Sequence, residues 1–315
     1  MRANDWTSPQ WRSSAHDWIT ARLTALGTPP AGPIEEVRVR PWSVTHRVST
    51  SEGVRWFKAN TPACAYEAGL ASALASWLPG RVLAPLAADT TRGWLLTADA
   101  GPTIRDRIKP GDQLTVWTAM LQTYASMQRA LEPRCDAMLA LGTPDLRKPA
   151  DVLASLRYEP GIRDRNRSPA PGFADWCAEL AADTVPVTLQ HDDLTDANVF
   201  PAPGGGFVFF DWGDASVGHP FGSLLVALGF AAAMLDLKPM APELLRLRDA
   251  YLEPWTDVAP PATLRRSASL AFRVARVSRA AAWRRAVENA ALPVDEDFRT
   301  ASAYWLSEIP KPALI

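Results

Sequence analysis

The 315-residue sequence contains few cysteines and no long apolar run. Its three cysteines, Cys64, Cys135 and Cys177, are odd in number and far apart, which argues against a disulfide framework and a structural zinc site. The longest apolar run, 224–235, is shorter than the ~20 residues that span a bilayer, and the N-terminal MRANDWTSPQW lacks the apolar core of a signal peptide. We therefore expect a cytoplasmic protein without a membrane partner.

An excess of charge of either sign is also missing. The chain has 33 Lys and Arg against 34 Asp and Glu, which gives a net charge of −1. Without a basic field we expect no binding to nucleic acid, and without an acidic tail no basic partner is indicated. Hydrophobic residues make up 47% of the chain, which at this length allows one large domain or two packed lobes.

The first hundred residues combine helix and strand patterns. Ser8 and Pro9 are typical of a helix start, and Gly27 is typical of its end. Alternation of apolar and polar residues then predicts an antiparallel meander, a helix and a further pair of strands. The predicted strands cover 35–42, 45–51, 54–60, 82–89 and 93–99, and the helix covers 63–78.

From Gly101 onward the pattern becomes mostly helical. Short apolar strands at 186–190 and 205–213 are predicted to form a hairpin around a polar loop. Because the pattern changes near Asp99, the predicted domains are 1–99 and 100–315. Helices are predicted at 114–131, 221–235, 241–251, 263–288 and 295–306, and a polar loop is predicted at 163–172.

The loop between the two short strands reads HDDLTDAN, residues 191–198. It is longer than a tight hairpin needs, so Asp193 and Asn198 could project toward a common point. A carboxylate can orient a hydroxyl and accept its proton, and an amide oxygen can bind a divalent cation. Asp211 follows the second apolar run, where a buried carboxylate favours metal binding. Taken singly, each of these residues is also an ordinary turn or strand-end residue.

The first half of the chain supplies what phosphoryl transfer also needs, a cation on the nucleotide phosphates held by a helix carboxylate. Lys58 is the only lysine among the first hundred residues and lies in a predicted strand, and Glu67 lies in the following helix. Each alone is readily explained as a surface charge. Together with the acidic loop, they follow the order in which kinases carry these residues.

These residues resemble the aminoglycoside phosphotransferase and choline kinase-like family, which has the protein-kinase-like fold. The family pattern His-Gly-Asp-Leu, three residues and Asn is similar to HDDL at 191–194 followed by Asn198, and its later Asp-Trp is similar to DWGD at 211–214. The resemblance covers about 36–249. It implies a two-lobed α+β fold, with a small antiparallel-sheet nucleotide-binding lobe and a larger, mostly helical lobe for catalysis and substrate binding.

The resemblance also implies roles for the acidic residues, position by position. Asp193 would be the catalytic base, and His191 would brace its loop. Asn198 and Asp211 would hold Mg²⁺. These four residues would form the reacting centre of the site.

Nucleotide contacts are implied for the N-terminal lobe. Lys58 would contact the α and β phosphates of ATP, and Glu67 would orient Lys58. The other implied contacts come from a phosphate loop (41–48) and from the backbone of a hinge (97–99). They are Ser43, Thr45, Thr97 and Asp99.

The sequence departs from the family pattern at several places. Asp192 stands where the family usually has Gly, and Ser223 stands where it usually has Asp. The phosphate loop, PWSVTHRV, contains no glycine, unlike a glycine-rich flap. This loop motivates an alternative function, a non-catalytic kinase-like module that binds a nucleotide or another ligand.

The acceptors of the family are small hydroxylated molecules bound by the helical lobe. Asp214 and Asp236 could receive amines. Arg273 and Arg276 lie one helical turn apart and Arg279 extends the row, so a row facing the substrate would favour an acceptor with a carboxylate or phosphate. The apolar residues between these arginines favour instead a row that faces solvent.

We therefore predict a two-lobed kinase-like enzyme that depends on ATP and Mg²⁺. Its γ-phosphoryl group would pass to a hydroxyl of a small molecule such as an aminoglycoside-like antibiotic, a sugar or an amino alcohol. The catalytic motif does not decide between a resistance enzyme and a metabolic one, because acceptor choice depends on pocket shape.

Overall fold

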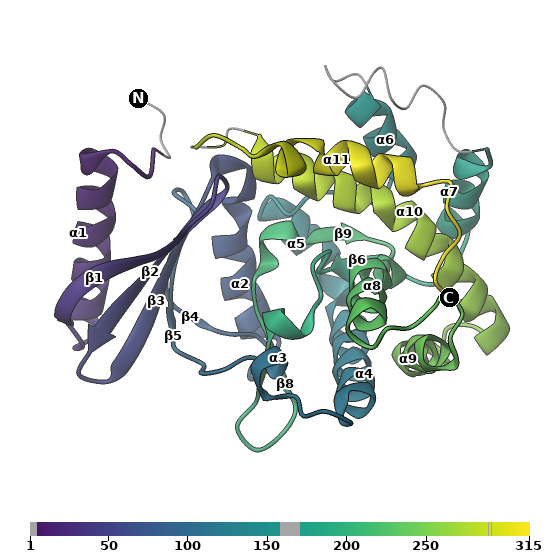
Figure 1. Cartoon of the computed structure of the whole chain (residues 1–315), viewed down its shortest axis with the longest axis horizontal. Coiled ribbons are helices and arrows are strands. Elements are labelled where there is room, and N and C mark those ends of the chain that lie inside the picture. Colours follow the sequence, from purple (N-terminus) through teal and green to yellow (C-terminus); the bar gives the residue numbers. More distant parts are fainter. Residues whose placement is uncertain (1–4, 158–170, 289, 291) are drawn as a thin grey trace. The chain divides into compact units, whose positions relative to one another are not determined.

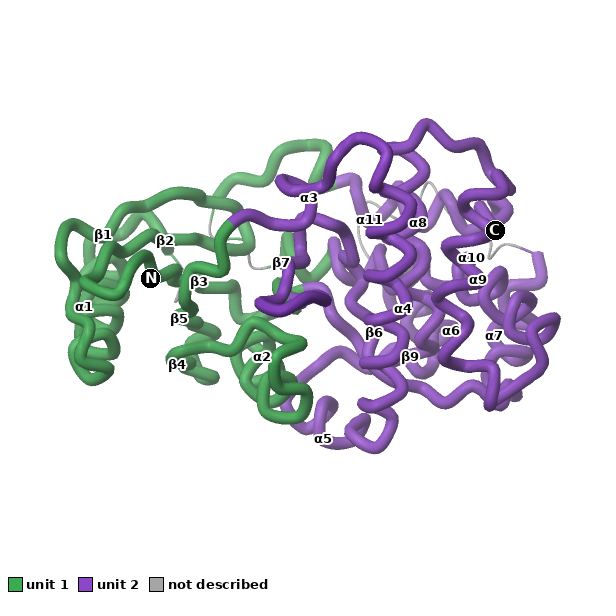
Figure 2. Tube along the Cα trace, turned by 90° about the horizontal axis from the view of Figure 1, so that it is seen from below, with its two compact units in different colours: residues 1–101, 210–213, 284–299 green, residues 102–209, 214–283, 300–315 purple. Residues whose placement is uncertain are grey.

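The computed structural model describes residues 5–157, 171–288, 290 and 292–315. They form two compact units, coloured separately in Figure 2, and Figure 1 labels the helices and strands. The first unit comprises Met1–Gly101, Phe210–Gly213 and Arg284–Arg299. The second comprises Pro102–Phe209, Asp214–Trp283 and Thr300–Ile315. Two short segments from late in the chain therefore belong to the first unit.

The first unit is built on a five-stranded antiparallel sheet with the order β1-β2-β3-β5-β4. The predicted meander, the two further strands and the predicted helices before and after the meander are confirmed. The strands are β1 (Pro30–Val39), β2 (Ser43–Thr50), β3 (Gly53–Asn60), β4 (Pro85–Asp89) and β5 (Trp94–Ala98). The helices are α1 (Pro9–Ala25) and α2 (Tyr66–Trp77), and α2 follows a short 3-10 turn, Pro62–Cys64.

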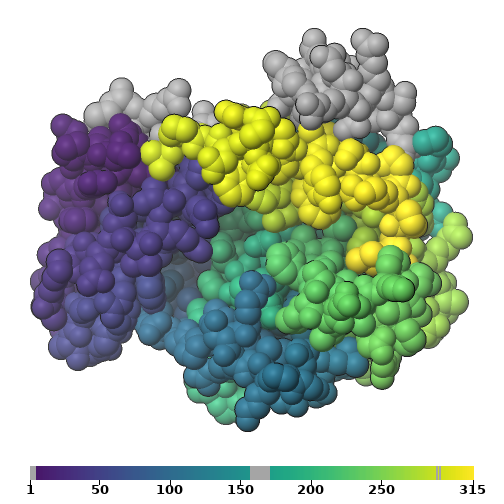
Figure 3. Space-filling view, viewed as in Figure 1, coloured from purple at the N-terminus to yellow at the C-terminus, as the bar shows by residue number. Residues whose placement is uncertain are grey.

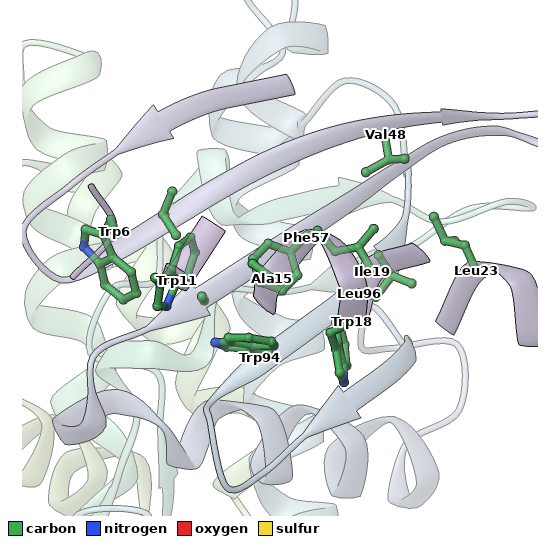
Figure 4. Close-up of a cluster of buried hydrophobic side chains, with 12 residues drawn as sticks. Trp6, Trp11, Ala15, Trp18, Ile19, Leu23, Val48, Phe57, Trp94 and Leu96 are labelled. Carbon is green, nitrogen blue, oxygen red and sulfur yellow. The ribbon is translucent and has the colours of Figure 1, made fainter. Parts of the chain in front are cut away.

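The alternation of side chains along the strands gives this sheet two different faces. On one face, Val48 and Phe57 are fully buried in a cluster with the apolar side of α1, to which Trp11 and Trp18 contribute (Figure 4). Ser8 begins α1 by accepting a hydrogen bond from the backbone of Trp11. The next residue of β3 after Phe57 is Lys58, which therefore faces the opposite side of the sheet.

The buried cluster contains one histidine. His46 is only 1% exposed, and its ring lies 5.5 Å from the ring of Phe57 and 5.6 Å from that of His16. Burial, then the charges of His16 and Arg12, lower the pKa of His46 to about 4. The Glu36 carboxylate, 4.0 Å from the His46 ring nitrogen, does not offset this. His46 is therefore neutral in the folded unit at pH 7.

We expect the first unit to lose stability as the pH falls from about 6.5 to about 4. In this window an unfolded histidine binds a proton but the folded His46 does not, so protons favour the unfolded chain. The full effect is about 3 kcal/mol. Urea unfolding at pH 7 and pH 4.5 should show a smaller loss in His46→Phe than in the wild type. An equal loss in both proteins would contradict the prediction.

The second unit is mostly helical, and all five helices predicted for this part of the chain are confirmed. They are α4 (Gln113–Leu131), α8 (Leu224–Met234), α9 (Pro242–Leu252), α10 (Pro261–Val287) and α11 (Glu296–Glu308). The sequence did not predict α3 (Ile104–Arg107), α5 (Cys135–Ala140), α6 (Pro149–Arg157) and α7 (Phe173–Ala181). Figure 3 shows the C-terminal residues, in yellow, at the surface of the molecule. The predicted polar loop 163–172 lies outside the described residues except for a turn at its last two positions.

Two short ribbons frame the loop at 191–198. One pairs β6 (Thr188–Gln190) with β9 (Ser216–Gly218), and the other pairs β7 (Val199–Pro201) with β8 (Phe207–Phe209). The predicted hairpin between 186–190 and 205–213 is therefore wrong, because these strands pair with other partners. The run Val199–Pro201 is too short to be recognised as a strand from its pattern.

No helix within the described residues is long and apolar enough to span a membrane.

Candidate active site

The first unit holds a lysine bound by two carboxylates. The Lys58 Nζ lies 2.6 Å from Oε2 and 2.9 Å from Oε1 of Glu67, and 2.6 Å from Oδ1 of Asp211. Burial by itself lowers the pKa of Lys58, but the charges of Asp211 and Glu67 outweigh it and raise this pKa. Three residues singled out from the sequence, separated by up to 153 positions, thus meet around one ammonium group.

Glu67 is the centre of this network and is only 2% exposed. Besides Lys58, its carboxylate accepts hydrogen bonds from the Asn60 side chain and from the backbone N–H of Trp212 at 3.0 Å. Burial raises the pKa of Glu67, and the Lys58 ammonium acts in the opposite direction. The carboxylate is therefore fixed from the sheet, the helix and the segment Phe210–Gly213 at once.

Asp211 adopts a left-handed backbone conformation, with φ of 65°. Such a conformation is uncommon for a residue other than glycine and occurs often at functional sites. The turn is held by Tyr66, whose hydroxyl donates to the Gly213 carbonyl at 2.6 Å. A Cβ on Gly213 would lie 3.2 Å from Oε2 of Glu67, so a side chain there would crowd the network.

The phosphate loop closes without a glycine. The backbone N–H of Arg40 donates to the Ser43 carbonyl at 2.8 Å, and that of Thr61 donates to the Trp42 carbonyl at 3.0 Å. None of residues 40–43 has a positive φ, so the turn does not need glycine. The Trp42 ring packs edge-on against Phe298 with centroids 5.0 Å apart. An aromatic contact therefore anchors this loop.

Ser43 and Thr45 lie on the same face of the sheet as Lys58. The Cα partner of Thr45 across β2 and β3 is Lys58, and that of Ser43 is Asn60. Ser43 is buried and Thr45 is partly exposed. Both predicted phosphate contacts thus belong to the face that carries the lysine.

The hinge is braced by a tryptophan that sequence reasoning missed. Trp56 precedes Lys58 by two positions in β3 and shares its face. It pairs with Thr97 across the sheet, and its indole N–H donates to Oδ1 of Asp99 at 3.1 Å. The Asp99 backbone N–H donates to the Val54 carbonyl at 3.2 Å. The signal for Trp56 was its position two residues before the lysine in an alternating strand.

In the second unit, the predicted catalytic loop (191–198) presents an aspartate held through both carboxylate oxygens. The Asn198 amide nitrogen donates to Oδ2 and to the backbone carbonyl of Asp193, each at 2.9 Å. Arg279 donates to Oδ1 of Asp193 at 3.0 Å. Since the amide nitrogen of Asn198 is engaged, its oxygen is the atom suited to a cation.

Asp192, which replaces the usual family glycine, keeps the backbone that a glycine would adopt. Its φ is 57°, in the left-handed region that asparagine and aspartate tolerate better than most residues. The side chain is 3% exposed, and the Ser216 hydroxyl donates to its Oδ2. The serine of β9 thus satisfies the carboxylate that the substitution brings into the loop.

Ser223, at the position where the family usually has aspartate, belongs to a polar network beneath the loop at 191–198. The Ser223 hydroxyl accepts a hydrogen bond from the backbone of His191 at 3.4 Å. The fully buried Gln128 donates to the Leu189 carbonyl at 2.7 Å and to the Ser223 hydroxyl at 3.4 Å, and it accepts from the Tyr251 hydroxyl. His191 itself is fully buried. A neutral network therefore supports the start of the loop.

The predicted substrate residues lie in three different settings. Asp214 accepts from Nη1 of Arg279 at 2.6 Å. Arg273 stacks its guanidinium 3.5 Å from the ring centroid of Trp176. Asp236 is exposed, with φ of 51°, after the end of α8. Only Asp214 is therefore linked to the catalytic loop by a contact described here.

The arginine row does not face solvent, so that interpretation is wrong. Arg276 and Arg279 are 5% and 9% exposed. Arg276 donates to backbone carbonyls of the C-terminal segment: those of Ile309, Lys311 and Pro312. Arg276 thus anchors backbone rather than presenting its charge to solvent, because the carbonyls compensate its burial.

The predicted metal ligands suit Mg²⁺ by their chemistry. Among the described residues there is no cluster of three or more His, Cys, Asp or Glu side chains able to hold a metal by itself. Mg²⁺ is usually bound through one or two carboxylates together with substrate phosphates and water, and it prefers oxygen ligands. The Asn198 amide oxygen and the Asp211 carboxylate are each an oxygen ligand of this kind.

The fold is protein-kinase-like. The chain belongs to the phosphotransferase enzyme family (APH), whose sequence profile matches residues 29–261. No curated protein sequence matches the chain.

Solved structures similar to this chain include a macrolide phosphotransferase, an ethanolamine kinase and a choline/ethanolamine kinase family protein. Macrolide 2'-phosphotransferase MphH from Brachybacterium faecium has 17% identity and a TM-score of 0.58 over 93% of this chain and 98% of that one. The Plasmodium vivax ethanolamine kinase has 12% identity and a TM-score of 0.61 over 98% and 90%. A choline/ethanolamine kinase family protein from Mesorhizobium loti has 20% identity and a TM-score of 0.53 over 93% and 92%. At these identities the likeness establishes the fold.

We expect Asp192→Gly to be tolerated better than Asp192→Ala. Both variants lose the carboxylate and its bond from Ser216, but glycine removes the left-handed strain whereas alanine keeps it. The strain difference corresponds to about 1–2 kcal/mol in the free energy of unfolding. Urea unfolding of both variants, with Ser216→Ala as the control for the lost bond, measures it. Equal stability of the glycine and alanine variants would refute the assignment of strain.

Proposed function

We propose that the chain is an ATP- and Mg²⁺-dependent phosphotransferase that moves the γ-phosphoryl group to a hydroxyl of a small molecule. The observation that carries this proposal is the Lys58 ammonium bound at once by Glu67 and Asp211. A nucleotide site needs a fixed cation for the phosphates and a carboxylate for the metal, and this network supplies both. Membership of the phosphotransferase family supports the same reaction class.

In this proposal residues 1–99 form the nucleotide-binding lobe. Lys58 binds the α and β phosphates and Glu67 keeps its ammonium in place. Ser43 and Thr45, on the same face as Lys58, contact phosphate oxygens. The hinge backbone at 97–99 meets the base, and the Trp56 ring lies beside the hinge to stack on it.

Residues 100–315 form the catalytic and substrate-binding lobe. Asp193 orients the acceptor hydroxyl and takes its proton as the oxygen bonds to the γ-phosphorus. The bond from that phosphorus to the bridging oxygen breaks, and ADP leaves. Asn198 and Asp211 would each supply an oxygen ligand to Mg²⁺, which would neutralise charge on the phosphates. The chain contributes position and charge, as this reaction requires.

The acceptor is a small hydroxylated molecule: an aminoglycoside-like antibiotic, a sugar or an amino alcohol. Similar structures bear the names of a macrolide phosphotransferase and an ethanolamine kinase, which supports a small acceptor without selecting one. The cysteines of the described structure are free thiols, in keeping with a cytoplasmic location. The non-catalytic alternative was motivated by the glycine-free loop, and a loop that closes without glycine no longer favours it.

We expect a non-hydrolysable ATP analogue to bind the protein more tightly with Mg²⁺ than without it. Asp211→Asn should lose this difference because it removes a metal-binding charge. Trp56→Ala should weaken binding about tenfold or more with and without Mg²⁺, since stacking on a base contributes about 1–3 kcal/mol. Titration calorimetry measures both effects.

Trp176→Ala is the matched control, because this tryptophan packs against Arg273 in the second unit. GTP analogues should be titrated in parallel, since one similar structure is a GDP complex of an aminoglycoside phosphotransferase. Failure of the wild type to bind either nucleotide would refute the proposal.

A further inference from the structure

An arginine on α10 reaches the catalytic loop within the second unit. The family profile ends at residue 261, the first residue of α10, so Arg279 lies beyond the matched part of the chain. Its side chain is buried, although the family resemblance gives no role to this position. Arg279 therefore requires an explanation of its own.

The guanidinium of Arg279 makes three contacts with the loop and the turn that follows it. Nη2 donates to Oδ1 of Asp193 at 3.0 Å, and Nη1 donates to the Asp192 carbonyl at 3.1 Å. Nη1 also donates to Oδ2 of Asp214 at 2.6 Å. One planar fork thus joins the proposed base, the backbone before it and a carboxylate from the next turn.

These contacts fix the orientation of the Asp193 carboxylate. Asn198 holds Oδ2 while Arg279 holds Oδ1, so rotation of the group would break one of the two bonds. A catalytic base must contact the acceptor hydroxyl while that hydroxyl lies in line with the phosphorus. A carboxylate with a fixed orientation favours this arrangement, because small misplacements of reacting groups reduce rates by about 100-fold. Neither contact by itself would hold the carboxylate in one plane.

The charges around Arg279 also favour its contact with the Asp193 carboxylate. The carboxylates of Asp193 and Asp214 contact one guanidinium, and the charge of Asp192 acts on it as well. Burial alone would lower the pKa of Arg279, but the charges of Asp214 and Asp193 outweigh it and raise this pKa. A lysine would preserve the charge but not the fork that contacts three acceptors at once.

The arginine is itself held in place. Its guanidinium lies 5.3 Å from the ring centroid of Trp283, one turn further along α10. One turn earlier, Arg276 is anchored on C-terminal carbonyls. The helix face that carries Arg279 is therefore packed on both sides. This packing fixes the guanidinium, as is needed if it is to fix the Asp193 carboxylate.

We propose that Arg279 is a positioning residue for phosphoryl transfer, which fixes the carboxylate of Asp193 against Asn198. This inference rests on the proposed function. It assigns to the helix beyond the family-matched residues a direct part in the reacting geometry. A purely structural role would predict instead that loss of Arg279 reduces folding and nucleotide binding together.

The test measures ADP release from MgATP with water as the acceptor, which yields ADP and inorganic phosphate, beside calorimetric binding of the MgATP analogue. Arg279→Ala should lower kcat about 100-fold and leave KM for MgATP within about twofold. Arg279→Lys should recover only part of the loss. Guanidinium chloride at non-denaturing concentrations should raise the kcat of Arg279→Ala several-fold. Arg266→Ala, on the same helix but paired with Glu179, should behave like the wild type.

The outcomes distinguish failure of the proposed function from failure of the positioning role of Arg279. A wild type that neither binds MgATP nor releases ADP overturns the proposed function and this inference with it. An active wild type with an equally active Arg279→Ala overturns this inference alone. If Arg279→Ala does not fold, Arg279→Gln with Asp214→Asn restores the charge balance and takes its place. Loss of kcat with an equal loss of nucleotide binding and no rescue by guanidinium also overturns the inference.

Discussion

The buried contact of the Lys58 ammonium with the carboxylates of Glu67 and Asp211 is the interaction on which the first unit depends. It draws the sheet, helix α2 and the segment Phe210–Gly213 into one unit, although that segment lies more than a hundred residues further along the chain. Glu67 is only 2% exposed, and a buried charge left unpaired costs several kcal/mol, so this carboxylate depends on the Lys58 ammonium. The contact that brings these three groups together is therefore also a constraint on folding.

In the second unit, the loop at 191–198 brings carboxylates close together, and few cations lie nearby to balance their negative charge. Each departure from the family pattern has a partner nearby. Asp192 is satisfied by Ser216, and the small hydroxyl of Ser223 is supplemented by Gln128. Because buried polar groups are costly unless they are hydrogen-bonded, such substitutions are tolerated only together with their partners. The pattern can therefore vary while the loop keeps its shape.

The strands and long helices could be predicted from the sequence because their signals are local: alternation for the sheet, and apolar periodicity for α4 and α10. The order of Lys58, Glu67 and Asp193 was also readable, since it is a property of the chain itself. The pairing of β6 with β9 could not be predicted, because the sequence of a short strand does not indicate which strand it pairs with. The burial of Arg276 and Arg279 was missed for the same reason, since the carbonyls and carboxylates that compensate them lie far away in sequence.

The C-terminal helices show where such distant partners matter most. Beyond residue 261, where the family profile ends, Arg279 contacts the catalytic loop in the second unit and Phe298 packs on Trp42 of the phosphate loop in the first. The backbone of a glycine-rich flap can adopt many conformations. The phosphate loop is instead held by the contact between the rings of Trp42 and Phe298, so its conformation is more fixed. Both contacts come from helices outside the matched region, so residues beyond the family profile help to fix the loops at 191–198 and 41–48 without any change in the motif HDDLTDAN itself.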